Sequence, residues 1–114
     1  VAHLDPLRDG TLDLAMRDGL AVLAWSPLAG GRLSSGDGIR PELLQVLDRL
    51  AEREGVDRAA VALAFVLAHP SRPVALVGSQ NAERLRSAAR ATSVRLDRSD
   101  LYELVQASEG APLP

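Results

Sequence analysis

Residues 25–32 bring together an aromatic side chain, two adjacent glycines and an arginine, residue types that suit a phosphate-bearing ligand. The adjacent Gly30 and Gly31 let the backbone approach an anion closely, and the guanidinium of Arg32 can pair with phosphate oxygens. The indole of Trp25 offers a flat face for stacking on an aromatic ring. The alternative is a flexible turn that follows a strand and a core tryptophan, and spacing alone favours this simpler explanation.

A second segment with similar chemistry contains Gly78, Ser79, Gln80, Asn81 and, three residues later, Arg84. It opens a predicted helix, and the free N–H groups and positive dipole end of a helix N-terminus attract anions. Arg84 falls in the first helical turn, where a cation is electrostatically unfavourable, and this hints at a function. Capping by Ser79 or Asn81 with a solvated arginine explains the segment equally well.

Both segments follow apolar runs, residues 20–25 and 74–77, that we expect to be strands. Short continuous apolar runs are typical of parallel strands that are buried on both faces. In parallel α/β folds, ligands bind beyond the carboxyl ends of the strands. We therefore expect the two loops at one edge of a sheet, with a dinucleotide across both, Trp25 on one ring and Arg84 at the far phosphate.

Helices are predicted before, between and after these strands. The expected helices cover residues 9–19, 41–54, 58–69 and 82–91, and a last helix follows Asp97. The expected N-caps of the first, third and fourth helices are Thr11, Asp57 and Asn81. Residues 28–38 are expected to form a loop. This alternation predicts an α/β fold with parallel strands. Because two parallel strands do not form a stable sheet alone, we expect the missing strands to belong to a longer chain.

The composition excludes several classes of function. A length of 114 residues allows at most one domain, and a hydrophobic content of 46% indicates that it is globular. The net charge of −2 predicts no basic surface for binding nucleic acid or an anionic membrane. The absence of cysteine fits a reducing cytoplasm. His3 and His69 lack the spacing of metal ligands, so we expect no metal site. The sequence also lacks a nucleophile elbow, a Walker loop and a dinucleotide-binding glycine fingerprint.

Three motifs resemble, in order, the last part of the aldo-keto reductases. Residues 24–33 resemble the loop after strand seven, and residues 63–70 resemble the helix that precedes the last strand. Residues 74–84 resemble the signature of strand eight, where Gly-Ser or Lys-Ser is followed five residues later by Arg. Trp25 with the Gly-Gly-Arg variant looks most like the bacterial oxidoreductases of the YdhF type. The resemblance covers nearly the whole chain.

The resemblance implies a (β/α)₈ TIM barrel that reduces the carbonyl group of a small substrate with NADPH. The chain would be the C-terminal portion, residues 1–114, with strands seven and eight, their helices and a loose tail at 110–114. Trp25 would stack on the nicotinamide. The residues that would bind the pyrophosphate are Ser26, Leu28, Gly30, Gly31 and Arg32. The residues that would bind the 2′-phosphate are Ser79, Asn81 and Arg84. Pro27, Gly78 and Gln80 complete the expected cofactor site.

The sequence also departs from the family pattern. Many members have Lys at the position of Gly78 and Glu-Asn at the positions of Ser87 and Ala88. The catalytic Asp, Tyr, Lys and His of the family lie on earlier strands, so no residue here is assigned to catalysis and we expect the chain alone to be inactive. Two alternatives stay open: an NADP-binding regulatory barrel without catalysis, and an independent helical interaction module.

Overall fold

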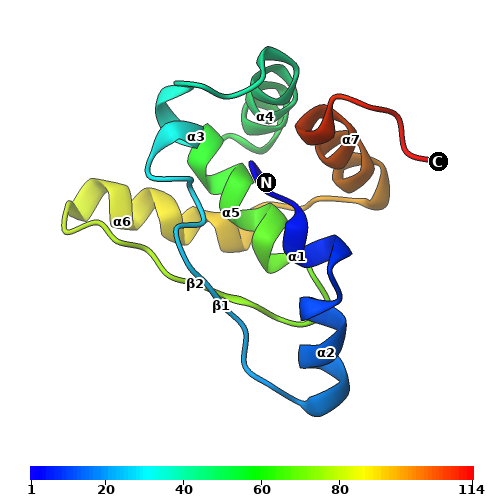
Figure 1. The fold of residues 1–114 in the computed structure, drawn as a ribbon. Helices are drawn as coiled ribbons and strands as arrows, with labels where there is room; N and C mark the ends of the chain where they lie inside the picture. Colours follow the sequence, from blue (N-terminus) through cyan, green and yellow to red (C-terminus); the bar gives the residue numbers. More distant parts are fainter.

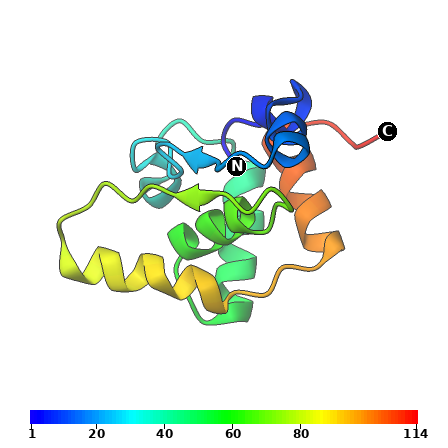
Figure 2. The same ribbon diagram turned by 90° about the horizontal axis from the view of Figure 1, so that it is seen from below.

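The computed structural model describes residues 1–114. The chain forms a small parallel sheet that lies beside a group of helices (Figure 1). Strand β1 (Leu23–Ala24) pairs with strand β2 (Val74–Ala75) over two residues each. Figure 2 shows both strand arrows pointing toward the same side of the molecule. The predicted parallel pairing is therefore confirmed, and the loops that follow the two strands emerge at one edge.

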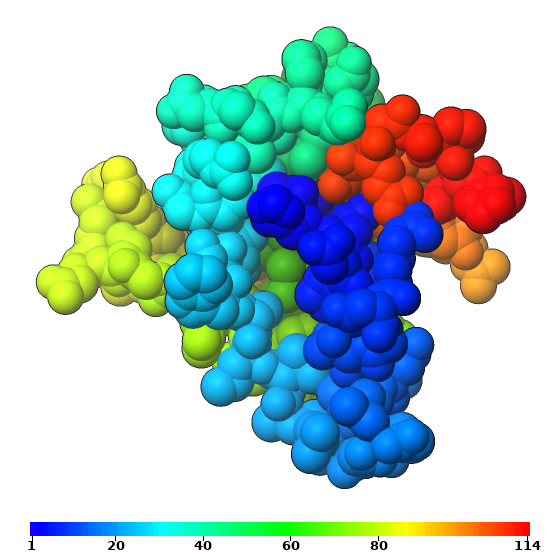
Figure 3. All heavy atoms as spheres, in the orientation of Figure 1, coloured from blue at the N-terminus to red at the C-terminus, as the bar shows by residue number.

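All five predicted helices are present, and three short helical segments were not predicted. The helices are α1 (Asp5–Arg8), α2 (Thr11–Asp18), α3 (Arg32–Ser35), α4 (Pro41–Glu54), α5 (Arg58–Leu67), α6 (Ala82–Ala89), the 3-10 helix η1 (Arg90–Ser93) and α7 (Arg98–Glu109). The short α3 lies inside the segment that was expected to be a loop throughout. Residues after Gly110 form no helix or strand and extend along the outer edge of the molecule (Figure 3).

Side-chain caps fix where three of the predicted helices begin. Asp57 accepts a hydrogen bond from the Ala60 N–H at 2.8 Å, and Asn81 accepts from the first turn of α6. Asp97 and Asp100 form a reciprocal capping box at the start of α7. The prediction for Thr11 was wrong: Thr11 is the first residue of α2, because its own N–H is bound by the carboxylate of Asp9 at 2.8 Å.

The burial predicted for the two strands was also wrong. Leu23 is 62% exposed and Val74 is 54% exposed, and the regular pairing covers only two residues of each predicted run. The reason is that no further strand of the chain pairs with this sheet, while α5 packs against β2. Trp25 is 85% exposed, so it is not part of the core that these 114 residues form.

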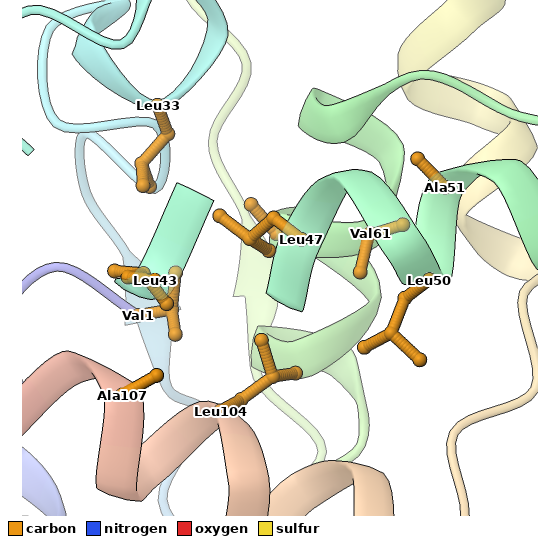
Figure 4. Packing of buried hydrophobic residues seen from close by; sticks show 10 residues of the cluster. Val1, Leu33, Leu43, Leu47, Leu50, Ala51, Val61, Leu104 and Ala107 are labelled. Atoms are coloured by element: carbon orange, nitrogen blue, oxygen red, sulfur yellow. The ribbon is translucent and has the colours of Figure 1, made fainter. Parts of the chain in front are cut away.

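The main hydrophobic core lies between α4, α5 and α7 rather than around the sheet. Leucines at helical spacing on α4 interdigitate with Val61 of α5 and Leu104 of α7 (Figure 4). The residues of this cluster are Val1, Leu33, Leu43, Leu47, Leu50, Ala51, Val61, Ala62, Leu104 and Ala107. Because Leu33 is fully buried here, the loop after β1 is anchored to the helical core through α3.

An ion pair joins α4 to α7 at the edge of this core. Arg53 donates to both carboxylate oxygens of Asp100 at 2.8 Å, and it also donates to the carbonyl of Arg95 at 2.8 Å. The hydrogen bonds from Arg53 hold the pKa of Asp100 below its ordinary value. Asp100 is 5% exposed, and its ion pair with Arg53 offsets the cost of burying its negative charge.

The substitution Asp100→Asn is expected to lower the free energy of unfolding at neutral pH by about 1–2 kcal/mol. Arg53 is 41% exposed, which keeps the loss below that of a fully buried pair. The pKa of Asp100 is lower in the folded state than in the unfolded state, where it is about 3.9. The ion pair therefore contributes fully to the free energy of unfolding above a pH of about 3.9, and this contribution is lost as the pH falls through the folded-state pKa. Urea unfolding across this acidic range measures both effects.

A matched control for this prediction is Glu103→Gln. Glu103 pairs with Arg49 between the same two helices, but both side chains are about half exposed. Such a surface pair contributes about 0–1 kcal/mol, so its loss should change stability less than Asp100→Asn. Equal effects of the two substitutions, or an unchanged acid dependence in the Asp100 variant, would contradict the assigned role of Asp100.

Candidate functional site

A groove opens at the edge of the sheet where the loops after β1 and β2 meet. Its volume is ≈ 1030 Å³, at the upper end of the range for sites that hold small molecules and cofactors. The first loop and α3 form one wall, and the second loop and α6 form another. The start of α5, with Asp57 and Ala59, contributes the remaining side.

The loop after β1 is shaped by its own hydrogen bonds. Ser26 and Ala29 have positive φ angles of 47° and 53°, and the Gly30 N–H donates to the hydroxyl of Ser26 at 3.1 Å. Gly31 has φ of 89°, and an added Cβ would meet no atom within 4 Å. Glycine is therefore required at position 31 for its conformation and not for space. The left-handed residues carry local strain, which is concentrated at functional sites in many proteins.

Arg58 attaches this loop to the helical core. Its guanidinium donates to both carboxylate oxygens of Asp48 at 2.6 and 2.7 Å and to the carbonyl of Ser34 in α3 at 3.3 Å. The hydrogen bonds from Arg58 lower the pKa of Asp48, which keeps that carboxylate charged. One residue of α5 thus positions the wall of the groove relative to α4.

The loop after β2 and the first turn of α6 form the facing wall. The Asn81 N–H donates to the Ser79 hydroxyl at 3.1 Å, and the Asn81 carboxamide oxygen accepts from the N–H groups of Glu83 and Arg84 at 2.9 and 3.1 Å. The side chain of Arg84 is exposed, lines the groove and has no hydrogen-bond or ion-pair partner in the chain. A free guanidinium beside a capped helix start can bind an anionic group.

The structure brings together most of the residues predicted for a cofactor. Those that line the groove are Trp25, Ser26, Pro27, Leu28, Gly30, Gly31, Gly78, Ser79 and Arg84. Arg32, Gln80 and Asn81 are not among the lining residues. Arg32 donates instead to the carbonyl of Ala29 at 3.1 Å, and the carboxamide oxygen of Asn81 is engaged in capping α6.

The groove also contains polar residues that the sequence interpretation did not assign to a site. Ser34 and Ser35 come from α3, Asp57 from the N-cap of α5 and Ser87 from the second turn of α6. The sequence does identify Asp57 as a cap, but its place beside α6 depends on how α5 packs against α6. Helical spacing gives one usable signal, because Ser87 lies three residues after Arg84 and so on the same face.

A second, largely apolar cavity of ≈ 520 Å³ lies on the other side of β1. It is lined by the N-terminal segment, by β1 and by Phe65 and His69 of the α5 end. Nδ1 of His69 accepts a hydrogen bond from the Ser71 N–H at 3.1 Å. No group of three potential metal ligands occurs in the chain, and none of its helices has the length and apolar character to cross a membrane.

Comparison with known proteins gives a consistent result for sequence and structure. The model of the aldo/keto reductase family matches residues 6–109. The chain is 41% identical to a 6-dehydroglucose reductase of Novosphingobium aromaticivorans, over 98% of this chain and 37% of the relative. It is 32% identical to the oxidoreductase YdhF of Escherichia coli, over 98% of this chain and 38% of the relative.

Solved structures agree with these sequence matches. A thermostable aldo-keto reductase, Tm1743, solved with the inhibitor epalrestat, superposes with a TM-score of 0.77 and 29% identity, over 90% of this chain and 35% of that one. Aldose reductase from Giardia lamblia has a TM-score of 0.67 at 21% identity, which supports the fold alone. The chain thus spans between a third and two fifths of the length of these proteins, which is why its sheet has only two strands.

Proposed function

Because the chain belongs to the aldo/keto reductase family and forms part of a TIM barrel, we propose that it is the C-terminal, cofactor-binding part of an NADPH-dependent reductase. The complete protein would reduce an aldehyde or ketone to an alcohol in the cytoplasm. The observation that carries the proposal is the groove in which two phosphate-compatible loops meet beside the unpaired guanidinium of Arg84.

The residues of the groove suit the parts of NADP(H) in a definite order. The exposed indole of Trp25 stands at the end of β1, where it can stack on the nicotinamide. Gly30 and Gly31, with backbone φ angles of 68° and 89°, allow close approach of the pyrophosphate. Ser79 and Arg84 offer a hydroxyl and a guanidinium to the 2′-phosphate. Bound NADPH supplies the hydride, and these residues hold and orient it.

The carbonyl substrate would bind mainly to the part of the barrel that lies outside residues 1–114. No residue of the chain corresponds to the Asp, Tyr, Lys and His that the family uses for proton transfer. Two relatives are reductases of 6-dehydroglucose, and this supports a small carbonyl compound as the substrate class. The part played by this chain is therefore to fix the nicotinamide relative to a site built by the preceding strands.

The test of this proposal uses the full-length protein. It should bind NADPH in a calorimetric titration and should consume NADPH in the presence of small aldehydes, ketones or oxidised sugars. Failure to bind NADPH would contradict the proposed function. Binding without consumption, across a broad carbonyl panel, would instead support a regulatory barrel, the second function that the same groove allows.

A further inference from the structure

The groove wall formed by α3 is held from behind by a guanidinium that does not itself line the groove. Nη1 of Arg58 donates to the carbonyl of Ser34 at 3.3 Å. The same guanidinium donates to the two carboxylate oxygens of Asp48 on α4 at 2.6 and 2.7 Å. Ser34 lines the groove, whereas Arg58 and Asp48 do not. Any effect of Arg58 on a ligand in the groove therefore passes through α3.

The contact with α3 is made where that helix ends. The last carbonyl groups of a helix have no partner within it, and Ser34 belongs to the only turn of α3. The C-cap Gly36 has φ of 91°, and a Cβ at this glycine would lie 3.3 Å from Nη1 of Arg58 and 3.3 Å from Cδ1 of Leu44. The guanidinium and Leu44 thus lie directly against the turn that ends α3, and they limit its movement.

The place of Arg58 in its own helix also indicates a role outside that helix. Arg58 is the first residue of α5, where a cation is unfavourable for the helix dipole. Its side chain is only 22% exposed and is engaged with α3 and α4. The charge of Asp48 balances that of Arg58, so the pair adds no net charge beside the groove. Its effect on a bound nucleotide is therefore one of position rather than of electrostatic attraction.

The position of α3 determines the position of the preceding glycine loop, residues 26–31. The N–H groups of Ser34 and Ser35 donate to the carbonyl of Gly31 at 2.9 and 3.1 Å, and the Gly31 N–H donates to the carbonyl of Leu28 at 3.0 Å. The loop also contains two non-glycine residues in the left-handed region, a conformation that persists only where the surroundings fix it. A displaced α3 would move the backbone that the proposed function assigns to the pyrophosphate.

We propose that Arg58 is a positioning residue for the cofactor, which holds the glycine loop in its binding conformation by linking α3 to Asp48. This inference rests on the proposed function, because it takes the groove to be the NADP(H) site. A loop that is ordered before binding lowers the entropy cost of binding. A loop that held this conformation only about a tenth of the time would raise the dissociation constant about tenfold. NADPH and NADH share the pyrophosphate, so both should be affected equally.

The experiment combines Arg58→Met with Asp48→Asn in the full-length protein, which removes the link without changing the net charge. Calorimetric titrations should give dissociation constants for NADPH and NADH that both rise about tenfold. Hydrogen exchange should become faster at the amides of residues 33–36, while α4 and α5 stay protected. Saturating NADPH should restore protection at residues 33–36, because the nucleotide selects the ordered loop.

The matched control combines Arg49→Met with Glu103→Gln. These substitutions remove another ion pair of α4 with the same change in charge, away from the groove. Both dissociation constants and the exchange of residues 33–36 should stay at their wild-type values. Arg58→Lys gives a second test variant, because lysine keeps the charge but lacks the planar fork that serves several acceptors. We expect it to weaken binding of both nucleotides by roughly threefold.

The outcomes separate this inference from the proposed function. Unchanged affinity in the Arg58→Met, Asp48→Asn variant, a loss confined to NADPH, or an equal loss in the control would overturn the inference alone. If the double variant does not fold, Arg58→Lys decides the question, and wild-type affinity in Arg58→Lys would overturn the inference. Failure of the wild-type protein to bind either nucleotide would overturn the proposed function and the inference together.

Discussion

Replacing Arg84 with alanine in the full-length protein is expected to weaken NADPH binding by roughly thirtyfold, while NADH binding changes by less than about twofold. A hydrogen bond to a charged group contributes about 1.5–3 kcal/mol, and the 2′-phosphate is the group that NADH lacks. The guanidinium has no partner within the chain, so its removal breaks no internal contact. Titrations with both nucleotides measure the two dissociation constants.

The control for this prediction is Arg86→Ala. Arg86 is exposed on the same helix but does not line the groove. The substitution Arg86→Ala removes the same charge as Arg84→Ala. This variant tests whether the weaker NADPH binding comes only from a general loss of electrostatic attraction between the protein and the phosphates of NADPH. Salt screens such a general attraction. Equal losses of NADPH and NADH affinity in Arg84→Ala, or the same effect in Arg86→Ala, would contradict the assignment of Arg84 to the 2′-phosphate.

Residues 1–114 produced alone are expected to show no NADPH-dependent carbonyl reduction above background, a larger effect than any single substitution. In the proposed function the groove orients the cofactor, but a reductase also needs a proton donor near the substrate. General acid catalysis alone contributes about 10²–10⁴-fold. We expect that group to lie on strands outside residues 1–114. The measurement is the rate of NADPH consumption with the carbonyl panel used for the full-length protein.

This second prediction needs a test that separates lack of catalysis from lack of structure. Circular dichroism should show helix, because the core between α4, α5 and α7 is formed within the chain. Co-expression with the preceding part of the barrel should restore activity. A measurable rate from residues 1–114 alone would show that a catalytic group lies within them. Cooperative unfolding of the isolated chain would favour an independent helical module.

The local features of the fold could be predicted from sequence because their causes are local. Asp57, Asn81 and Asp97 cap helices as predicted, since a short side-chain acceptor bonds N–H groups only two or three residues away. The parallel order of the strands also follows from the alternation of elements. The two loops were expected at one edge, and they do line one groove.

The remaining features depend on contacts between distant segments, which periodicity does not encode. The apolar runs around Leu23 and Val74 correctly indicate strands, but the partners that would bury them are absent from the chain. The same pattern could not show that Asp57 contacts Ser87 across thirty residues, because this contact is set by the packing of α5 against α6. Asp57 therefore was recognised as a helix cap but not as part of the groove.

The two-stranded sheet has a consequence for how this polypeptide behaves inside a cell. Each strand pairs on one side only, so both outer edges present unpaired backbone groups beside exposed Leu23, Val74 and Leu76. Such edges are templates for strand addition between molecules, and they lead to aggregation unless they are covered. A polypeptide of this length would thus expose unpaired strand edges and apolar side chains, which are features that chaperones and proteases act on.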